Sequence, residues 1–211
     1  MPRKPLPSYV LPLAALAVLV LALAGVLIAR AGNSSGPSTP ATTSANGGFE
    51  GAPLSGTPAP DFTLTDQSGR RVSLSDFRGH VVVLTFLYPG CGATCTVIAQ
   101  QIRGALDELP SPVPVLIASA DPASDNAAAT ARFLSSVSLT GRALYLTGPE
   151  SALTPIWHAY RVKPASAGPA LFDSYAFVML IDGSGRERVL YESEQLTPEG
   201  LAHDIRALGG G

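Results

Sequence analysis

Hydrophobic residues are distributed along this chain in three different ways. Residues 10–29 form one uninterrupted apolar stretch, residues 31–58 carry few large apolar side chains, and from residue 59 apolar runs alternate with polar turns. An uncharged apolar run of about 20 residues is long enough to cross the hydrocarbon core of a bilayer as a helix. The pattern therefore predicts a membrane anchor, a linker and one folded domain.

The flanks of the apolar stretch indicate its orientation. Arg3 and Lys4 precede it and only Arg30 follows it closely, so the positive-inside rule places the N-terminus in the cytoplasm. We expect a cytoplasmic N-terminus at 1–9, a single transmembrane anchor at 10–29, a flexible linker at 30–58 and an extracytoplasmic domain at 59–208. A cleaved signal peptide is the competing interpretation, although the apolar run is longer than the usual core of such a peptide.

Within the folded part, apolar runs typical of strands alternate with runs of helical periodicity. Strands are predicted at 62–64, 71–74, 80–88, 113–120, 143–146, 175–181 and 188–192, and helices at 96–109, 126–137, 151–160 and 198–208. This order predicts the α/β class, in the form of a thioredoxin-like sandwich with a central mixed sheet and an N-terminal hairpin, preceded by one transmembrane helix. About 150 residues suit one such domain.

Composition narrows the range of functions. The chain is 46% hydrophobic and 14% charged, with a formal net charge of −2. A chain with this balance lacks the basic surface that nucleic acids require.

The only two cysteines, Cys91 and Cys95, stand between a predicted buried strand and a predicted helix. Within a regular helix their Cβ atoms would be about 5–6 Å apart, too far for a disulfide. Cys91 is therefore expected in the turn before the helix, where the amides of the helix start stabilise a thiolate. A ring of about five residues contributes little as a structural staple. Thiol–disulfide exchange, binding of copper or another soft metal, and an inert disulfide remain as alternatives.

Several sequence motifs of the domain resemble those of the Sco/SenC family of thioredoxin-like proteins. They are Ala59-Pro60-Asp61-Phe62, the stretch from Phe86 to Cys91, the Cys-x-x-x-Cys spacing, the Asp121-Pro122-x-x-Asp125 motif, and Leu139-Thr140-Gly141 with the later Tyr160-Arg161-Val162. The first of these motifs, Ala59-Pro60-Asp61-Phe62, also occurs in peroxiredoxins and TlpA-like reductases. The resemblance implies a membrane-anchored extracytoplasmic protein that helps to assemble the copper centre of a respiratory cytochrome c oxidase. Its implied partners are the copper-bearing subunit of that oxidase or other extracytoplasmic thiol proteins.

The resemblance also implies copper, Cu(I) or Cu(II), as a ligand of both cysteines and of a histidine just before the penultimate strand. In this chain Ser174 stands at the position of that histidine. A serine hydroxyl is a hard, neutral oxygen with little affinity for Cu(I). Cys91 and Cys95 are thus candidate catalytic residues and candidate copper ligands, with the usual third ligand missing.

The chain has three histidines that can be considered as a replacement for the missing ligand. His80 opens a strand at the end opposite to the cysteines, and His203 lies in the terminal helix, where we expect it to be solvated. His158 is the one conceivable substitute, although an exposed helix histidine explains it as well. We expect none of the three to bind metal with the cysteines.

Two further pairs of residues are candidates for a role at the site. Asp173 and Tyr175 flank the Ser174 position, and Asp173 is a candidate for proton transfer. Asp121 and Asp125 resemble a carboxylate pair, but an acid at the start of a helix is already explained by capping.

The function that we predict is that of a membrane-anchored, Sco-like thiol–disulfide oxidoreductase acting in assembly of the oxidase copper centre. In this mechanism Cys91 is the attacking thiolate and Cys95 resolves the mixed disulfide. The first alternative is a Cu(I)-binding metallochaperone that uses Cys91 and Cys95. The second is a generic TlpA-like thiol reductase, which the Cys-x-x-x-Cys spacing disfavours.

Overall fold

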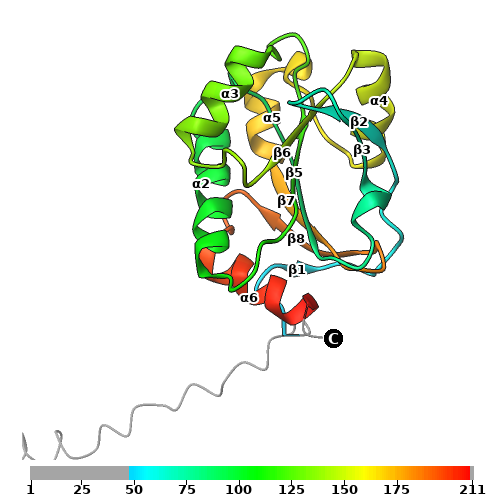
Figure 1. The fold of residues 1–211 in the computed structure, drawn as a ribbon, viewed down its shortest axis with the longest axis vertical. Coiled ribbons are helices and arrows are strands. Elements are labelled where there is room, and N and C mark those ends of the chain that lie inside the picture. The colour runs from blue at the N-terminus through cyan, green and yellow to red at the C-terminus, as the bar shows by residue number, and fades with distance from the viewer. Residues whose placement is uncertain (1–47, 210–211) are drawn as a thin grey trace, which may run out of the picture. The chain divides into compact units, whose positions relative to one another are not determined.

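The computed structural model describes residues 48–209 (Figure 1). The predicted cytoplasmic N-terminus, the transmembrane anchor and most of the linker lie outside these residues and stay predictions. Among residues 48–209, no helix combines the length and the apolar character that crossing a membrane requires.

The centre of the domain is an eight-stranded mixed sheet with the order β1-β8-β7-β4-β5-β6-β2-β3. Strands β4, β5 and β6 are parallel to one another, and the remaining pairs are antiparallel. The strands are β1 (Ala52–Pro53), β2 (Thr63–Asp66), β3 (Arg71–Ser73), β4 (Val82–Leu87), β5 (Val115–Ser119), β6 (Leu144–Thr147), β7 (Phe177–Ile181) and β8 (Glu187–Glu192). The mixed sheet and the N-terminal hairpin, formed by β2 and β3, confirm the predicted architecture.

The helices cover the two faces of this sheet. They are α2 (Ala93–Glu108), α3 (Ala127–Ser136), α4 (Glu150–Ala159), α5 (Pro169–Tyr175) and α6 (Pro198–Gly209), with short 3₁₀ segments η1 (Leu74–Phe77) and η2 (Ala165–Ala167). Figure 1 shows α2 and α3 on one side of the sheet and α4 on the other. Helix α2 packs closely on α6. A Cβ atom added to Gly104 of α2 would lie only 2.9 Å from Cγ of Pro198 in α6.

Strand β4 leads into the turn at residues 88–92, which contains Cys91 and is called the cysteine turn below. The strand is buried along its whole length. Its polar side chain, Thr85, is satisfied because its hydroxyl donates to the carbonyl of Phe177, 2.7 Å away. A strand that is buried on both faces is expected to be nearly continuously apolar, as the sequence of β4 is. The last residue of this strand, Leu87, therefore has a well-defined position four residues before Cys91.

Residues 52–58, which composition predicted to be flexible linker, are bound along the edge of the sheet through strand β1 and an isolated bridge between Pro58 and Arg186. Strand β1 pairs with β8, and the Leu54 amide donates to the Arg188 carbonyl at 2.8 Å. The carboxylate of Asp204 accepts from the amides of Glu50 and Gly51 at 2.9 and 3.0 Å. Backbone hydrogen bonds hold this segment, and apart from Leu54, which packs against the core, its side chains show no apolar pattern that would predict them.

Tyr175 was predicted to begin a strand, and this was wrong. The structure places it at the end of helix α5, and β7 begins two residues later. The helix starts with Pro169, whose ring favours a first helical position, directly after Gly168 at φ +117°. A helix of seven residues carries too few turns for its periodicity to stand out in the sequence.

Candidate functional site

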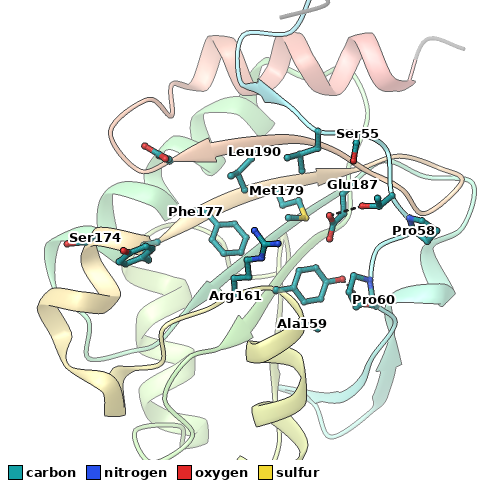
Figure 2. Close-up of a pocket in the computed structure, with 16 residues that line it drawn as sticks. Ser55, Pro58, Pro60, Ala159, Arg161, Ser174, Phe177, Met179, Glu187 and Leu190 are labelled. Carbon is teal, nitrogen blue, oxygen red and sulfur yellow. Dashed lines mark hydrogen bonds between the residues drawn. The ribbon is translucent and has the colours of Figure 1, made fainter.

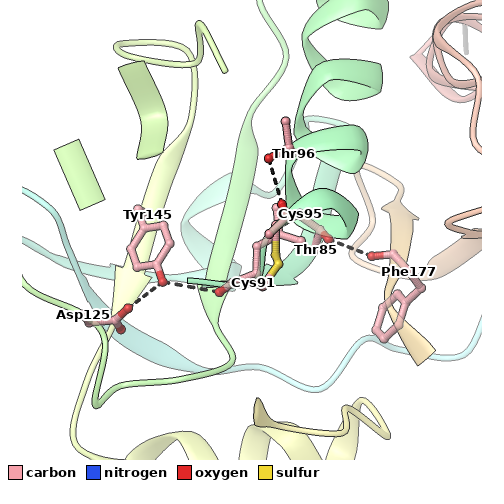
Figure 3. Close-up of a disulfide and its surroundings, with 9 residues drawn as sticks. Thr85, Cys91, Cys95, Thr96, Asp125, Tyr145 and Phe177 are labelled. Carbon is pink, nitrogen blue, oxygen red and sulfur yellow. Dashed lines mark hydrogen bonds between the residues drawn. A yellow bond between two sulfur atoms is a disulfide. The ribbon is translucent and has the colours of Figure 1, made fainter. Parts of the chain in front are cut away.

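The two cysteines lie on either side of the start of helix α2. After β4 the chain turns through Pro89 and Gly90, and the Cys91 amide donates to the Tyr88 carbonyl at 3.2 Å. Gly92 caps the helix at φ +72°, a left-handed value that glycine adopts without strain. Cys91 therefore precedes the helix, as predicted, while Cys95 lies in its first turn. A disulfide joins them with their Cα atoms 5.7 Å apart (Figure 3).

The two sulfur-bearing residues differ in exposure. Cys95 is 1% exposed and belongs to the hydrophobic core, whereas Cys91 is only partly buried. A thiolate must be reachable by its target before it can attack. This asymmetry suits Cys91 as the group that meets a partner and Cys95 as the group that closes the ring.

A buried hydrogen-bond network lies behind the cysteine turn (Figure 3). The hydroxyl of Tyr145, which is fully buried, lies 2.6 Å from Oδ1 of Asp125 and 3.3 Å from the Leu87 carbonyl. The Thr147 hydroxyl donates to the other carboxylate oxygen of Asp125. Burial, and then the nearby Asp125 charge, raise the pKa of Tyr145 far above its usual range.

This network corrects the capping role expected for Asp125. The residue that caps α3 is Asn126, whose Oδ1 accepts from the Ala129 amide at 2.9 Å. Asp125 instead fixes the loop after β5 to strand β6. Sequence reasoning missed Tyr145 and Thr147 because their link to Asp125 spans about 20 positions and depends on strand order.

Helix α5 borders the other side of the turn. The ring of Phe172 packs edge-on against Tyr88 with centroids 5.0 Å apart. Burial, and then the charges of Asp173 and Asp121, raise the pKa of Tyr88. Among the described residues, Oδ1 of Asp173 is buried without a hydrogen-bond partner. The structure thus places Asp173 beside the residue that begins the cysteine turn.

Ser174 does not complete a copper site. Its hydroxyl donates to the Ala170 carbonyl, 2.9 Å away in its own helix. No group of three or more histidine, cysteine or acidic side chains that could hold a metal ion occurs in the part of the chain that the structure describes. The donor set near the disulfide is therefore two sulfurs, which does not fit the three-ligand copper site that the family resemblance implied.

The histidines do not supply a third ligand within residues 48–209. His80 is exposed just before β4, at the strand end away from Cys91. His203 lies in α6, with Nδ1 2.9 Å from Oδ1 of Asp204. His158 is exposed on α4.

A groove of about 670 Å³ lies on the sheet face next to Ser174 (Figure 2). Phe177, Met179 and Leu190 line it with apolar surface, and Figure 2 shows Arg161 and Glu187 among them. Burial raises the pKa of Glu187, although the Thr57 hydroxyl and the Arg161 charge act in the opposite direction.

A mixed sheet with a cysteine pair at a strand-to-helix junction defines the class of thioredoxin-like proteins. Comparison with known families is more specific, since a family model described as SCO1/SenC matches residues 53–209. The chain belongs to this family.

Relatives agree with this assignment. The chain is 33% identical to the mitochondrial protein SCO2 homolog of Bos taurus over 114 residues, which are 52% of this chain and 42% of that protein. The chain thus spans less than half the length of this curated relative. Apo Sco1 of Thermus thermophilus is similar at 27% identity with a TM-score of 0.63, covering 76% of this chain and 96% of its own. The fold of BsSco, at 20% identity, has a TM-score of 0.63 and covers 74% of this chain and 95% of its own.

Proposed function

We propose that this chain is a membrane-anchored, extracytoplasmic thiol–disulfide oxidoreductase that acts in assembly of the copper centre of a cytochrome c oxidase. The observation that carries the proposal is the cysteine pair itself. Cys91 is accessible in a turn, Cys95 is buried one helical turn away, and the side chain at the usual histidine position bonds within its own helix.

In the proposed reaction, the reduced Cys91 thiolate attacks one sulfur of a partner disulfide. A mixed disulfide forms and the partner releases its first thiolate. The Cys95 thiolate then attacks the Cys91 sulfur, which releases the second partner thiolate and closes the Cys91–Cys95 disulfide. Two electrons pass from this chain to the partner, and no metal takes part in either step.

The relatives support the oxidase context of this proposal. BsSco contains a disulfide switch and is a member of the Sco family of cytochrome c oxidase assembly proteins. The partners we propose are the copper-bearing subunit of the oxidase or other extracytoplasmic thiol proteins. The apolar stretch at 10–29 would hold the domain near such membrane-embedded partners.

Complementation of a strain that lacks this chain tests the proposal. We expect Cys91→Ser and Cys95→Ser to abolish the gain in oxidase activity and to leave the cysteines of the copper-bearing subunit oxidised. Ser174→Ala is the matched control and should complement like the parent, because the serine hydroxyl is not a ligand. A Cys91→Ser chain that complements fully would refute the proposal.

A further inference from the structure

A second hollow, of about 700 Å³, lies between helix α4 and the segment that contains η2. We refer to it as the basic cavity, because His158, Arg161 and Lys163 line it together with the ring of Tyr175. Its one acidic lining residue, Glu150, lies in the first turn of α4. Eight positions separate Glu150 from His158, which is about 12 Å along the helix. The end of the cavity near Tyr175 is therefore cationic.

None of these three basic side chains takes part in an ion pair within residues 48–209. Arg161 also lines the neighbouring groove together with Glu187, where its charge opposes the rise in the pKa of that carboxyl. The ammonium group of Lys163 lies 5.9 Å from the centroid of the Tyr175 ring. A contact between an ammonium group and an aromatic ring leaves the positive charge unneutralised.

The two helices that border the turn containing Cys91 each carry exposed apolar side chains. In the described part of the chain the exposed large hydrophobic residues are Val97 at 44%, Leu171 at 40% and Tyr175 at 56%. Val97 follows Cys95 on α2, and the other two lie four residues apart on α5. Tyr175, the most exposed of the three, also lines the basic cavity and supplies an apolar surface at the cationic end.

The basic cavity is attached to the strand ends from which the cysteine turn emerges. Nε1 of Trp157 donates to the Ser119 carbonyl at 2.9 Å, and the Ala165 amide donates to the Ala120 carbonyl at 3.0 Å. The Ala120 amide in turn donates to the carbonyl of Leu87, also at 3.0 Å. The walls of the cavity and Cys91 thus both lie at the carboxyl ends of strands β4 and β5.

Apart from the exposed Glu150 at the other end of the cavity, the acids near this end of the strands are less accessible. Asp121 and Asp173 act on Tyr88 and are both partly buried. Lys163 and Arg161 are exposed. The exposed charges at the Tyr175 end of the cavity are therefore positive, whereas the carboxylates that act on Tyr88 are partly buried.

We infer that the basic cavity, with Tyr175 at its mouth, docks an acidic segment of the protein whose disulfide Cys91 attacks. This inference rests on the proposed function and names the chemistry of its substrate. Carboxylates of the partner pair with Lys163 and Arg161 while apolar residues beside its cysteines pack on Tyr175. Charge pairing of this kind raises the rate of encounter more than it raises affinity.

The experiment compares the rates at which the reduced full-length chain, in a mild nonionic detergent, reduces matched peptides. The peptides have one internal disulfide, equal length and four flanking positions that are all Glu, all Gln or all Lys. Hydroxyethyl disulfide, which is small and uncharged, reports whether the dithiol reacts at all. At low ionic strength we expect the Glu peptide to react on the order of tenfold faster than the Gln peptide, and the advantage to shrink at 0.5 M salt.

Two substitutions and one control locate the effect. Lys163→Gln and Arg161→Gln should each reduce the Glu-to-Gln rate ratio several-fold. Arg206→Gln removes one charge from the terminal helix, where its contact with Glu108 at 3.4 Å is exposed, and should leave the ratio as in the parent. An equal loss with Arg206→Gln would show a general charge effect and would overturn the inference.

The other outcomes are equally decisive. A parent ratio of one, with normal reduction of hydroxyethyl disulfide, would refute acidic docking and leave the proposed function standing. No reaction with hydroxyethyl disulfide would refute the proposed function itself. If Lys163→Gln lowered the melting temperature but not the Glu-to-Gln rate ratio, the role of the cations would be to stabilise the C-terminal end of α4, and the inference would be refuted. Loss of the ratio in nanodiscs containing phosphatidylglycerol, but not in phosphatidylcholine nanodiscs, would show that the cavity faces lipid and would overturn the inference.

Discussion

Replacing Asp125 with alanine should destabilise the domain more than any exposed acid does. The substitution removes the acceptor of the buried Tyr145 hydroxyl, at 2.6 Å, and that of the Thr147 hydroxyl. A hydrogen bond to a charged group contributes about 1.5–3 kcal/mol. Since Asp125 is only partly buried and water can replace part of the loss, we expect the free energy of unfolding to fall by about 3 kcal/mol.

Two comparisons isolate the cause. Tyr145→Phe should cost less, about 1 kcal/mol, because the Leu87 carbonyl keeps the Ala120 amide as a donor. The double variant should show a coupling of about 1–2 kcal/mol between Asp125 and Tyr145. Asp107→Ala removes two ion pairs at 2.6 Å, but these pairs are exposed, so we expect a cost below about 1 kcal/mol.

Urea unfolding of a fragment covering residues 44–211, with the disulfide closed, measures these values. The single tryptophan, Trp157, is 5% exposed and reports unfolding by its fluorescence. If Asp125→Ala cost no more than Asp107→Ala, or if the coupling with Tyr145 were zero, the network would not hold the strand ends as we describe.

Three further outcomes follow from the structure. Burial alone would raise the pKa of Asp66, but hydrogen bonds from Ser68 and Arg70 outweigh it and lower this pKa to about 2. The ionised carboxylate therefore stabilises the fold fully above about pH 4, and this stabilisation is lost as the pH falls toward 2. The free energies of unfolding of Asp66→Asn and of the parent should differ by about 1–2 kcal/mol at pH 7 and converge at pH 2. After reduction, iodoacetamide should label Cys91 at least about tenfold faster than Cys95, measured by peptide mass spectrometry, and equal labelling would contradict the exposure difference. Gly104→Ala should destabilise the domain by about 1–2 kcal/mol despite the better helix propensity of alanine, because its Cβ would meet Pro198; a gain in melting temperature would show that α6 moves aside.

Much of the fold followed from periodicity, because each long element carries its own pattern. The buried strand β4 and helix α2 were predicted nearly in full, although α2 begins at Ala93, three residues earlier than expected. The separation of Cys91 from the helix also followed from local geometry, since a closed disulfide at this spacing is incompatible with two helical cysteines.

What could not be predicted depends on contacts between distant segments. Strand β1 consists of Ala52 and Pro53, whose exposed side chains carry no pattern, and only backbone bonds to β8 define it. The partners of Asp125 lie on a strand that sequence cannot place beside it. The position of Ser174 could be read from the sequence, but the bond to Ala170 could not, because the short helix α5 was not expected.

The central claim is that this chain keeps the dithiol chemistry of its family without the third copper ligand. Anaerobic titration of the reduced chain with Cu(I), against a competing chelator, tests it most directly when the Ser174→His variant is measured in parallel. We expect weak binding by the parent and tight one-to-one binding by Ser174→His, because the histidine would add an imidazole nitrogen, which suits copper, to the two thiolates. Tight one-to-one binding by the parent would contradict the account and would favour a Cu(I) metallochaperone that uses Cys91 and Cys95.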